Sequence, residues 1–144
     1  MAFGLLALIA ATFFTGVALY VNVAEQPARL LLDDRALLIE WKPSYKRGAA
    51  MQAPLALAGC LLGLIAWWQT PHPGFLIGAV AMIAPWPWTL IGIKPTNDAL
   101  LATEPDGAGP QTRALVVKWG ARHGVRTALG ALATVAFLWA CIPR

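Results

Sequence analysis

Four side chains at the start of the last apolar segment have the types and spacing for proton-transfer chemistry. Trp119, Arg122, His123 and Arg126 lie at offsets of zero, three, four and seven, so on a helix they share one stripe. Imidazole titrates near neutral pH, which makes His123 a candidate base. The alternative is that His123 is a hydrogen-bonded residue at a membrane interface and that the two arginines contact lipid phosphates.

An acidic residue at the end of the first apolar segment could assist this base. Glu25 is the only acidic residue attached to that segment, and its carboxylate could act as a general base or orient His123. The competing interpretation is an ion pair with Arg29, Arg47 or Arg126, as expected for an acid at a membrane boundary.

Amide and aromatic groups near these positions could bind a substrate. Asn22 and Asn97 could donate hydrogen bonds to an anionic oxygen, although Thr96 or Asn97 is also expected to cap a short helix. Trp86 and Trp88 flank a Pro-containing break in the third apolar segment and are candidates for lining an apolar pocket.

Metal and haem sites are not expected from the histidines and cysteines. His72 and His123 belong to opposite ends of the predicted spans, about one bilayer thickness or ~30 Å apart. A transition-metal site would need His123 together with Glu25 or Asp98. The two cysteines are predicted at different depths, which favours free thiols over a disulfide. No cofactor is therefore predicted.

The elements that must position these residues are four apolar segments. The chain is 58% hydrophobic and 12% charged, against about 25% charged residues in soluble proteins. Seventeen of its eighteen charged residues lie in Glu25–Arg47 or Lys94–Arg126. We therefore predict an all-α, four-helix transmembrane bundle that forms a single membrane domain, residues 1–144. The predicted spans are residues 2–23, 48–68, 74–93 and 125–142.

Both charged connections are predicted to face the cytoplasm. The first connection holds five Lys and Arg residues, the second holds four, and the turn at residues 69–73 holds none. Because positive loops are retained in the cytoplasm, both termini and the short turn should lie outside, in the inner membrane if the organism is bacterial. This topology accounts for the net charge of +4, so no nucleic-acid partner is expected. The first segment is expected to remain as a span.

Three local features interrupt the simple four-span pattern. Leu30–Trp41 interleaves apolar and charged residues, which predicts a short amphipathic helix that lies at the membrane interface or caps the bundle. Ala84–Thr89 contains two prolines one residue apart, so the third span should break there and need protein or a cavity to cover its freed carbonyls. After a Gly- and Pro-rich loop at Glu104–Thr112, a helix is expected from Arg113 into the fourth span.

Several segments resemble the anthrone oxygenase-like family of membrane proteins. They are Gly16–Arg29, Trp41–Gln52, Pro87–Leu100, and the set Trp119, His123, Arg126 and Thr127. The resemblance implies a small four-helix membrane protein. It also implies an activity like that of the family's fungal members, which oxidise polyketide anthrones to anthraquinones with dioxygen and without an established cofactor.

A mechanism can be written for such a substrate. Removing the acidic ring proton of an anthrone gives an enolate that reacts directly with dioxygen, so the protein must supply a base, an oxyanion donor and a dry aromatic pocket. We expect His123 as the base, oriented by Glu25. The enolate oxygen is expected to meet Asn97, Tyr45, Arg47 or Arg126. The full set of expected substrate-binding residues is Asn22, Arg29, Tyr45, Arg47, Trp86, Trp88, Asn97, Trp119 and Arg126.

Two non-catalytic functions fit the same sequence. A binding or transport protein would take up a quinone, lipid or drug, although a proton-coupled exporter should carry its acid deeper than Glu25. An accessory subunit would dock on a larger membrane complex, or on a second copy of itself, through small residues such as the GxxxG pair Gly59 and Gly63. Those glycines could equally pack helices within one bundle.

Overall fold

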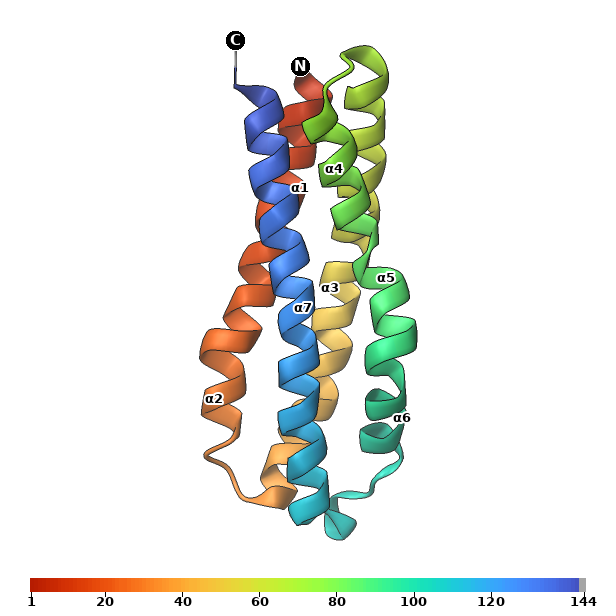
Figure 1. Cartoon of the computed structure of the whole chain (residues 1–144). Helices are drawn as coiled ribbons and strands as arrows, with labels where there is room; N and C mark the ends of the chain where they lie inside the picture. Colours follow the sequence, from red (N-terminus) through yellow and green to blue (C-terminus); the bar gives the residue numbers. More distant parts are fainter. Residues whose placement is uncertain (143–144) are drawn as a thin grey trace.

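A computed structural model of the chain describes residues 1–142 and consists of helices throughout the membrane-spanning parts (Figure 1). In the described residues, four helical stretches are long and apolar enough to cross a membrane. This confirms the prediction of an all-α bundle with four apolar helices. Pro143 and Arg144, at the end of the predicted domain, lie outside the described residues. The four stretches are Ala2–Arg29, Asp34–Gln69, Pro73–Ala102 and Pro110–Cys141.

Two of the stretches are uninterrupted and two are built from shorter pieces. The uninterrupted helices are α3 (Asp34–Gln69) and α7 (Pro110–Cys141). The first stretch consists of α1 (Ala2–Tyr20), the π-helix η1 (Val21–Glu25) and α2 (Gln26–Arg29). The third consists of α4 (Pro73–Ile83), α5 (Pro85–Trp88), the π-helix η2 (Thr89–Ile93) and α6 (Lys94–Ala102). A 3₁₀ turn, η3 (Pro105–Gly107), lies in the last loop.

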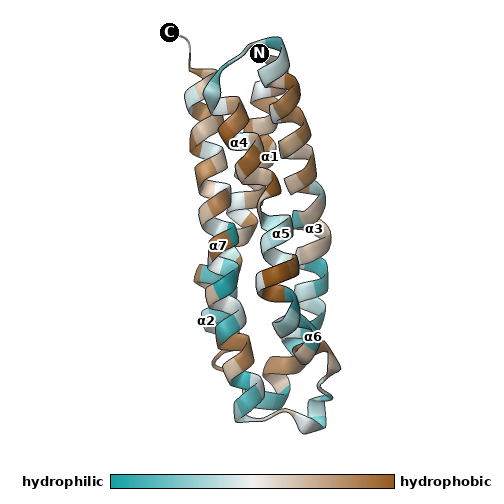
Figure 2. Cartoon of the chain, turned by 45° about the vertical axis from the view of Figure 1, so that its right-hand side comes forward, coloured by the Kyte–Doolittle hydropathy of each residue, from teal (hydrophilic) through white to brown (hydrophobic). Residues whose placement is uncertain are grey.

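The two charged connections lie at the same end of the bundle. In Figure 1 the start of α1, the end of α7 and the α3–α4 turn are together at the top, and the α2–α3 and α6–α7 loops are together at the bottom. Hydrophilic residues are concentrated in the lower half of the bundle (Figure 2). A helix of 36 residues, the length of α3, is about 54 Å long and exceeds the ~30 Å hydrocarbon layer. The bundle therefore extends beyond the membrane at its polar end.

The amphipathic segment expected at Leu30–Trp41 is not a separate interfacial helix. Asp33 caps α3 by accepting a hydrogen bond from the Ala36 backbone N–H at 2.8 Å, and the helix then continues into the second span. Leu37, Leu38 and Trp41 are completely buried in the bundle. Burying these large apolar side chains against protein stabilises the packed position over one on the membrane surface.

The third stretch breaks where the sequence predicts, and α7 bonds to the segment that follows the break. α4 ends at Ile83, and Pro85 begins α5. Trp88 Nε1 donates to the Arg122 carbonyl at 3.0 Å, and the Arg122 guanidinium donates to the Gly92 carbonyl of η2 at 2.6 Å. These bonds give the Arg122 and Gly92 carbonyls the internal partners that backbone groups need away from water.

Two local predictions about helix ends need correction. Thr96 and Asn97 do not cap a helix, because α6 already begins at Lys94 with Pro95 in its first turn, and both side chains are buried inside the bundle. α7 begins at Pro110 rather than Arg113. Proline is well suited to the first turn of a helix, where its missing N–H has no partner to lose.

The core has an apolar part near the termini and an aromatic part near the charged loops. The first includes Phe14, Phe75, Met82 and Phe137, and the second includes Trp41, Ile93, Leu100, Val116 and Trp119. Glycines permit the close packing: a Cβ on Gly63 would lie 2.7 Å from the Phe137 ring, and one on Gly59 would lie 2.6 Å from Met82 Cε. The GxxxG pair thus packs within this bundle.

Candidate functional site

His123 is held by an amide from the first stretch. Its Nδ1 lies 2.8 Å from Asn22 Oδ1. Asn22 belongs to the π-helix η1, and His123 belongs to α7. The same amide oxygen accepts a 2.8 Å hydrogen bond from the Thr127 hydroxyl, and Asn22 Nδ2 donates to the Gly120 carbonyl at 2.9 Å. The Asn22 side chain therefore bonds to three residues of α7, which are Gly120, His123 and Thr127.

These contacts fix the protonation of the imidazole ring. The Asn22 nitrogen must face the Gly120 carbonyl, because a carbonyl can only accept. Asn22 Oδ1 then faces His123 and can also only accept, so neutral His123 must carry its proton on Nδ1. The lone pair of Nε2 is left available, and none of the described residues hydrogen-bonds to it. Nε2 is thus the ring nitrogen of His123 that can accept a proton.

Arg126 lies one helical turn beyond His123 and is anchored from two sides. Its guanidinium donates to the Thr89 hydroxyl at 2.7 Å and to Gln52 Oε1 at 2.8 Å. The guanidinium carbon is 5.6 Å from the centre of the Phe14 ring, a cation–π geometry. Arg126 Nε is buried without a hydrogen-bond partner among the described residues. Within the described part of the chain, Arg126 therefore keeps an unpaired donor inside the protein, and its side chain lines the same inner cavity as His123.

A tyrosine supplies a second donor. Asn97 Nδ2 donates to the Tyr45 hydroxyl oxygen at 3.2 Å, so the Tyr45 proton is not used in this bond. The ring of Tyr45 stacks on Trp41 with centroids 4.9 Å apart and planes 2° apart. Trp119 contacts Trp41 edge-on at 5.7 Å and lies 5.0 Å from the His123 ring. Direct ring contacts through Trp41 and Trp119 thus connect the Tyr45 side chain to the His123 imidazole.

These groups surround a small internal space, which we call the inner cavity. Its volume is about 30 Å³, and its lining includes Tyr45, Gln52, Asn97, Trp119, His123 and Arg126. Ligand pockets for drug-sized molecules usually measure about 300–1,000 Å³. The inner cavity therefore has room for something of the size of a water or dioxygen molecule, but not for a polycyclic substrate.

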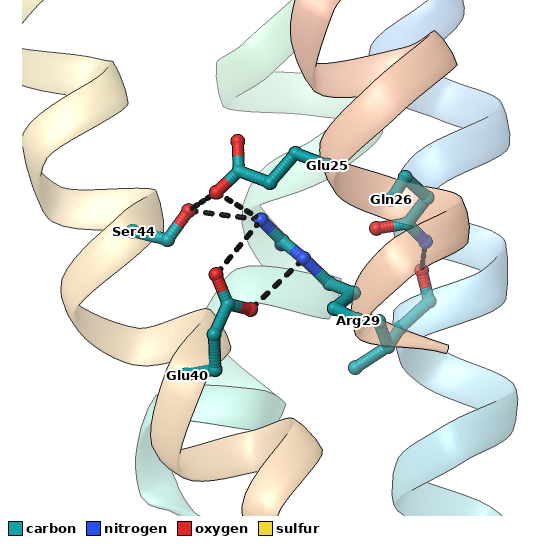
Figure 3. Close-up of polar contacts among 6 residues, drawn as sticks. Glu25, Gln26, Arg29, Glu40 and Ser44 are labelled. Carbon is teal, nitrogen blue, oxygen red and sulfur yellow. Dashed lines mark hydrogen bonds and ion pairs between the residues drawn. The ribbon is translucent and has the colours of Figure 1, made fainter. Parts of the chain in front are cut away.

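A buried ion cluster joins the first stretch to α3 next to this cavity (Figure 3). The Arg29 side chain is only 1% exposed and contacts Glu25 at 2.5 Å and Glu40 at 3.0 Å. Ser44 accepts a 2.9 Å hydrogen bond from Arg29 and donates to Glu25. Two carboxylates compensate the buried cation, which would otherwise be strongly unfavourable.

The expected orientation of His123 by Glu25 is therefore corrected. Glu25 is engaged by Arg29 and Ser44, and the partner of the imidazole is Asn22. The ion-pair alternative for Glu25 is the one found. Arg29 also lies over Trp119, with its guanidinium carbon 5.6 Å from the ring centre, so the cluster contacts a residue that lines the inner cavity.

A much larger open space lies between α1 and α3, and we call it the outer groove. Its volume is about 1050 Å³. Apolar side chains such as Ile9, Phe13 and Met51 line most of it, and Glu25, Glu40, Ser44 and Arg47 line its polar end. Val21, Ser44 and Gly48 line both the outer groove and the inner cavity. The two spaces are therefore neighbours that share a wall.

The sequence pattern of the anthrone oxygenase family matches residues 41–136, two thirds of this chain. The chain belongs to the anthrone oxygenase family. It is also similar to anthrone oxygenase tpcL of Aspergillus fumigatus, with 30% identity over 131 residues, which cover 84% of this chain and 81% of tpcL. No solved structure matches the chain.

The matched part of this anthrone oxygenase family member contains most of the inner-cavity residues. Tyr45, Asn97, Trp119, His123 and Arg126 lie within residues 41–136. Asn22 and the Glu25–Arg29 pair lie on the first helical stretch, before the matched range.

The remaining residues expected to bind substrate lie elsewhere. Arg47 lines the outer groove rather than the inner cavity. Trp88 is committed to the Arg122 carbonyl, and Trp86 is 42% exposed. Neither tryptophan lines the inner cavity or the outer groove.

Several residues around the site were given no role in it from the sequence. Gln52, Thr89 and Thr127 hold Arg126 and Asn22. Gln26 is buried and donates to the Val116 carbonyl at 2.8 Å. The available signal was the presence of uncharged polar side chains in otherwise apolar spans, where such groups need internal partners.

Metal coordination has little support from the side chains in place. Across residues 1–142, no three His, Cys, Asp or Glu side chains gather at one point. Cys60 and Cys141 are free thiols, as the sequence predicts.

Proposed function

We propose that this chain is a membrane oxygenase that converts an anthrone-type substrate to a quinone with dioxygen. The observation that carries the proposal is the fixed imidazole of His123, whose proton is held at Nδ1 by Asn22 while Nε2 faces no protein partner. Membership of the anthrone oxygenase family supports the substrate class.

In the first step, His123 Nε2 removes a proton from the ring CH₂ group of the anthrone. The product is an enolate, whose charge resides largely on the former carbonyl oxygen. Tyr45 and Arg126 are the donors for this oxygen, because each has a hydrogen-bonding proton left over from its contacts with protein. Donors fixed in advance stabilise charge that develops in the transition state without reorganising at that moment.

In the second step, the carbanion carbon transfers its electrons to dioxygen and forms a carbon–oxygen bond. The peroxide anion takes the proton back from His123 to give a hydroperoxide. Loss of water from this hydroperoxide leaves a carbonyl at the oxidised carbon, so one anthrone and one dioxygen give one anthraquinone and one water. The inner cavity, at about 30 Å³, suits dioxygen waiting beside the base.

A second function is favoured by the outer groove. A volume of about 1050 Å³ suffices for ligand binding without turnover, so a binding or transport protein for a small aromatic molecule is the alternative. Such a protein would bind a quinone but consume no oxygen.

Oxygen uptake by purified protein decides between the two. The protein in lipid nanodiscs is mixed with a dihydroxyanthrone, and dioxygen consumption and quinone formation are recorded against empty nanodiscs. The oxygenase proposal requires equal amounts of dioxygen consumed and quinone formed, at a rate well above the spontaneous oxidation. Binding of the corresponding quinone with no oxygen uptake above the empty discs would support the alternative.

A further inference from the structure

We propose that the outer groove is the substrate-binding site and that its ligand, a neutral hydroxylated polycyclic aromatic molecule, enters it sideways from the hydrocarbon of the membrane. The ligand class rests on the proposed function. The inner cavity is too small for such a molecule, at about 30 Å³, whereas the outer groove offers about 1050 Å³. Of these two spaces, only the groove can hold fused rings.

The groove is open towards lipid along one side of α1. Its lining extends along the helix from Leu8 to Glu25. These positions are seventeen residues apart, which corresponds to a groove length of about 25 Å. Its wall residues Ile9, Phe13 and Met51 are between 51% and 64% exposed on the outside of the bundle. An apolar molecule dissolved in the bilayer can therefore enter without crossing water, which suits a substrate with low solubility.

The polar end of the groove determines which apolar molecule fits. Glu25 and Glu40 line this end and flank a single buried cation, Arg29. Carboxylates are strong acceptors, so they favour a ligand that carries hydroxyl protons. Arg47 lines the same end, so the polar end carries both signs of charge, and a phospholipid is the competing occupant that the experiment below must separate from the aromatic ligand.

His123 lines the inner cavity and not the groove, so turnover requires the reacting carbon to lie against the wall that the two spaces share. Gly48 contributes no side chain to the wall that it shares with Val21 and Ser44. A Cβ atom on Gly48 would meet nothing within 4 Å, and the same holds for Gly16 farther along the groove. Both glycines therefore leave space that a ligand can use, rather than space needed for helix packing.

Because the space around Gly16 and Gly48 is open, larger side chains at these positions should fill the groove without disturbing the core. Gly16→Leu and Gly48→Leu each add a side chain to open space, and leucine favours the helix more than glycine does. Gly107→Leu is the matched control, because it also meets nothing within 4 Å and lies in the distant η3 turn. Thermal unfolding of all three variants checks that the fold is retained.

The probe is a dihydroxyanthraquinone, a stable molecule with the shape of the expected product, and binding is measured in nanodiscs with correction for partition into empty discs. We expect the native protein to bind it at least about tenfold more tightly than unsubstituted anthraquinone, because hydrogen bonds to charged acceptors are lost in the latter. Gly16→Leu and Gly48→Leu should each weaken binding by about tenfold or more. Gly107→Leu should bind like the native protein.

The outcomes separate this inference from the proposed function. Native binding and native turnover in both groove variants would overturn the groove as the substrate site and leave the oxygenase proposal intact. Groove-dependent binding without any oxygen uptake would support the groove and overturn the oxygenase. Loss of a copurifying lipid in the groove variants, with quinone binding unchanged, would assign the groove to lipid and overturn the inference.

Discussion

The proposed mechanism depends on which nitrogen of His123 carries the proton. Asn22 determines this, because its own orientation is fixed by the Gly120 carbonyl and its oxygen already accepts from Thr127. A histidine that could exchange tautomers would present its lone pair towards the inner cavity for only part of the time. In the proposed mechanism, the arrangement therefore removes a tautomer that could not act as the base.

The first prediction concerns this tautomer. In ¹⁵N-histidine NMR spectra of the native protein, His123 should show a protonated Nδ1 and an unprotonated Nε2, with assignment by difference from His123→Ala. Asn22→Ala should give a mixture of tautomers and lower kcat by about tenfold or more, as loss of orienting partners does elsewhere. Quinone binding should be little changed. A native spectrum with the proton on Nε2 would contradict the assignment of Nε2 as the base.

At the residue scale, the sequence predicted which residues of α7 line the inner cavity better than it predicted which side chains contact one another. The helical spacing of Trp119, His123 and Arg126 predicted a common stripe, and all three line the inner cavity. The orienting role given to Glu25 was wrong because Arg29, four residues further along the chain, pairs with its carboxylate. The π-helix at Val21–Glu25 inserts a wider turn, and Asn22 there contacts α7.

At the scale of elements, α7 is the scaffold on which the other stretches are assembled. It carries His123 and Arg126, accepts the Asn22 and Gln26 amides on its backbone, and covers the broken third stretch through Arg122. The prolines of Ala84–Thr89 predicted that break from sequence. Burial of Leu37, Leu38 and Trp41 was not predictable, because an amphipathic pattern fits a membrane surface as well as a bundle interior.

The second prediction tests the packing of these elements. Gly63→Ala should lower the free energy of unfolding by about 1–3 kcal/mol, the usual cost of overpacking, because its Cβ would lie 2.7 Å from the Phe137 ring. Gly16→Ala, which meets nothing within 4 Å, should be neutral or stabilise by about 0.5–1 kcal/mol. Reversible unfolding in mixed micelles measures both. Equal effects of the two substitutions would contradict the packing described for α3 and α7.

At the scale of the whole molecule, the segregation of charge predicts the end of the bundle near which the candidate site lies. Both charged connections lie at one end of the bundle (Figure 2), and the ion cluster and the inner cavity are built from helix segments next to that end. This much follows from composition, because apolar spans of bilayer length force charges into the connections. The outer groove was not predictable, since it depends on how α1 and α3 pack.

The third prediction concerns orientation, which we infer from the positive charges of the loops. With Cys60 and Cys141 replaced by alanine, Gly107→Cys should react with a membrane-impermeant thiol reagent only from the cytoplasmic side. Thr70→Cys, in the turn between α3 and α4, should react only from the opposite side. Intact cells and inverted vesicles provide the two sides. The reverse labelling pattern would show that the polar end faces outwards.

The most direct test of the oxygenase proposal is the rate of quinone formation by His123→Ala compared with the native protein, in the same nanodiscs and with a saturating dihydroxyanthrone. We expect kcat to fall by roughly 10²–10⁴-fold, the usual contribution of a general base, while binding of the dihydroxyanthraquinone is retained. Oxidation by His123→Ala at the native rate would contradict the account, because the proton would then be removed by another group.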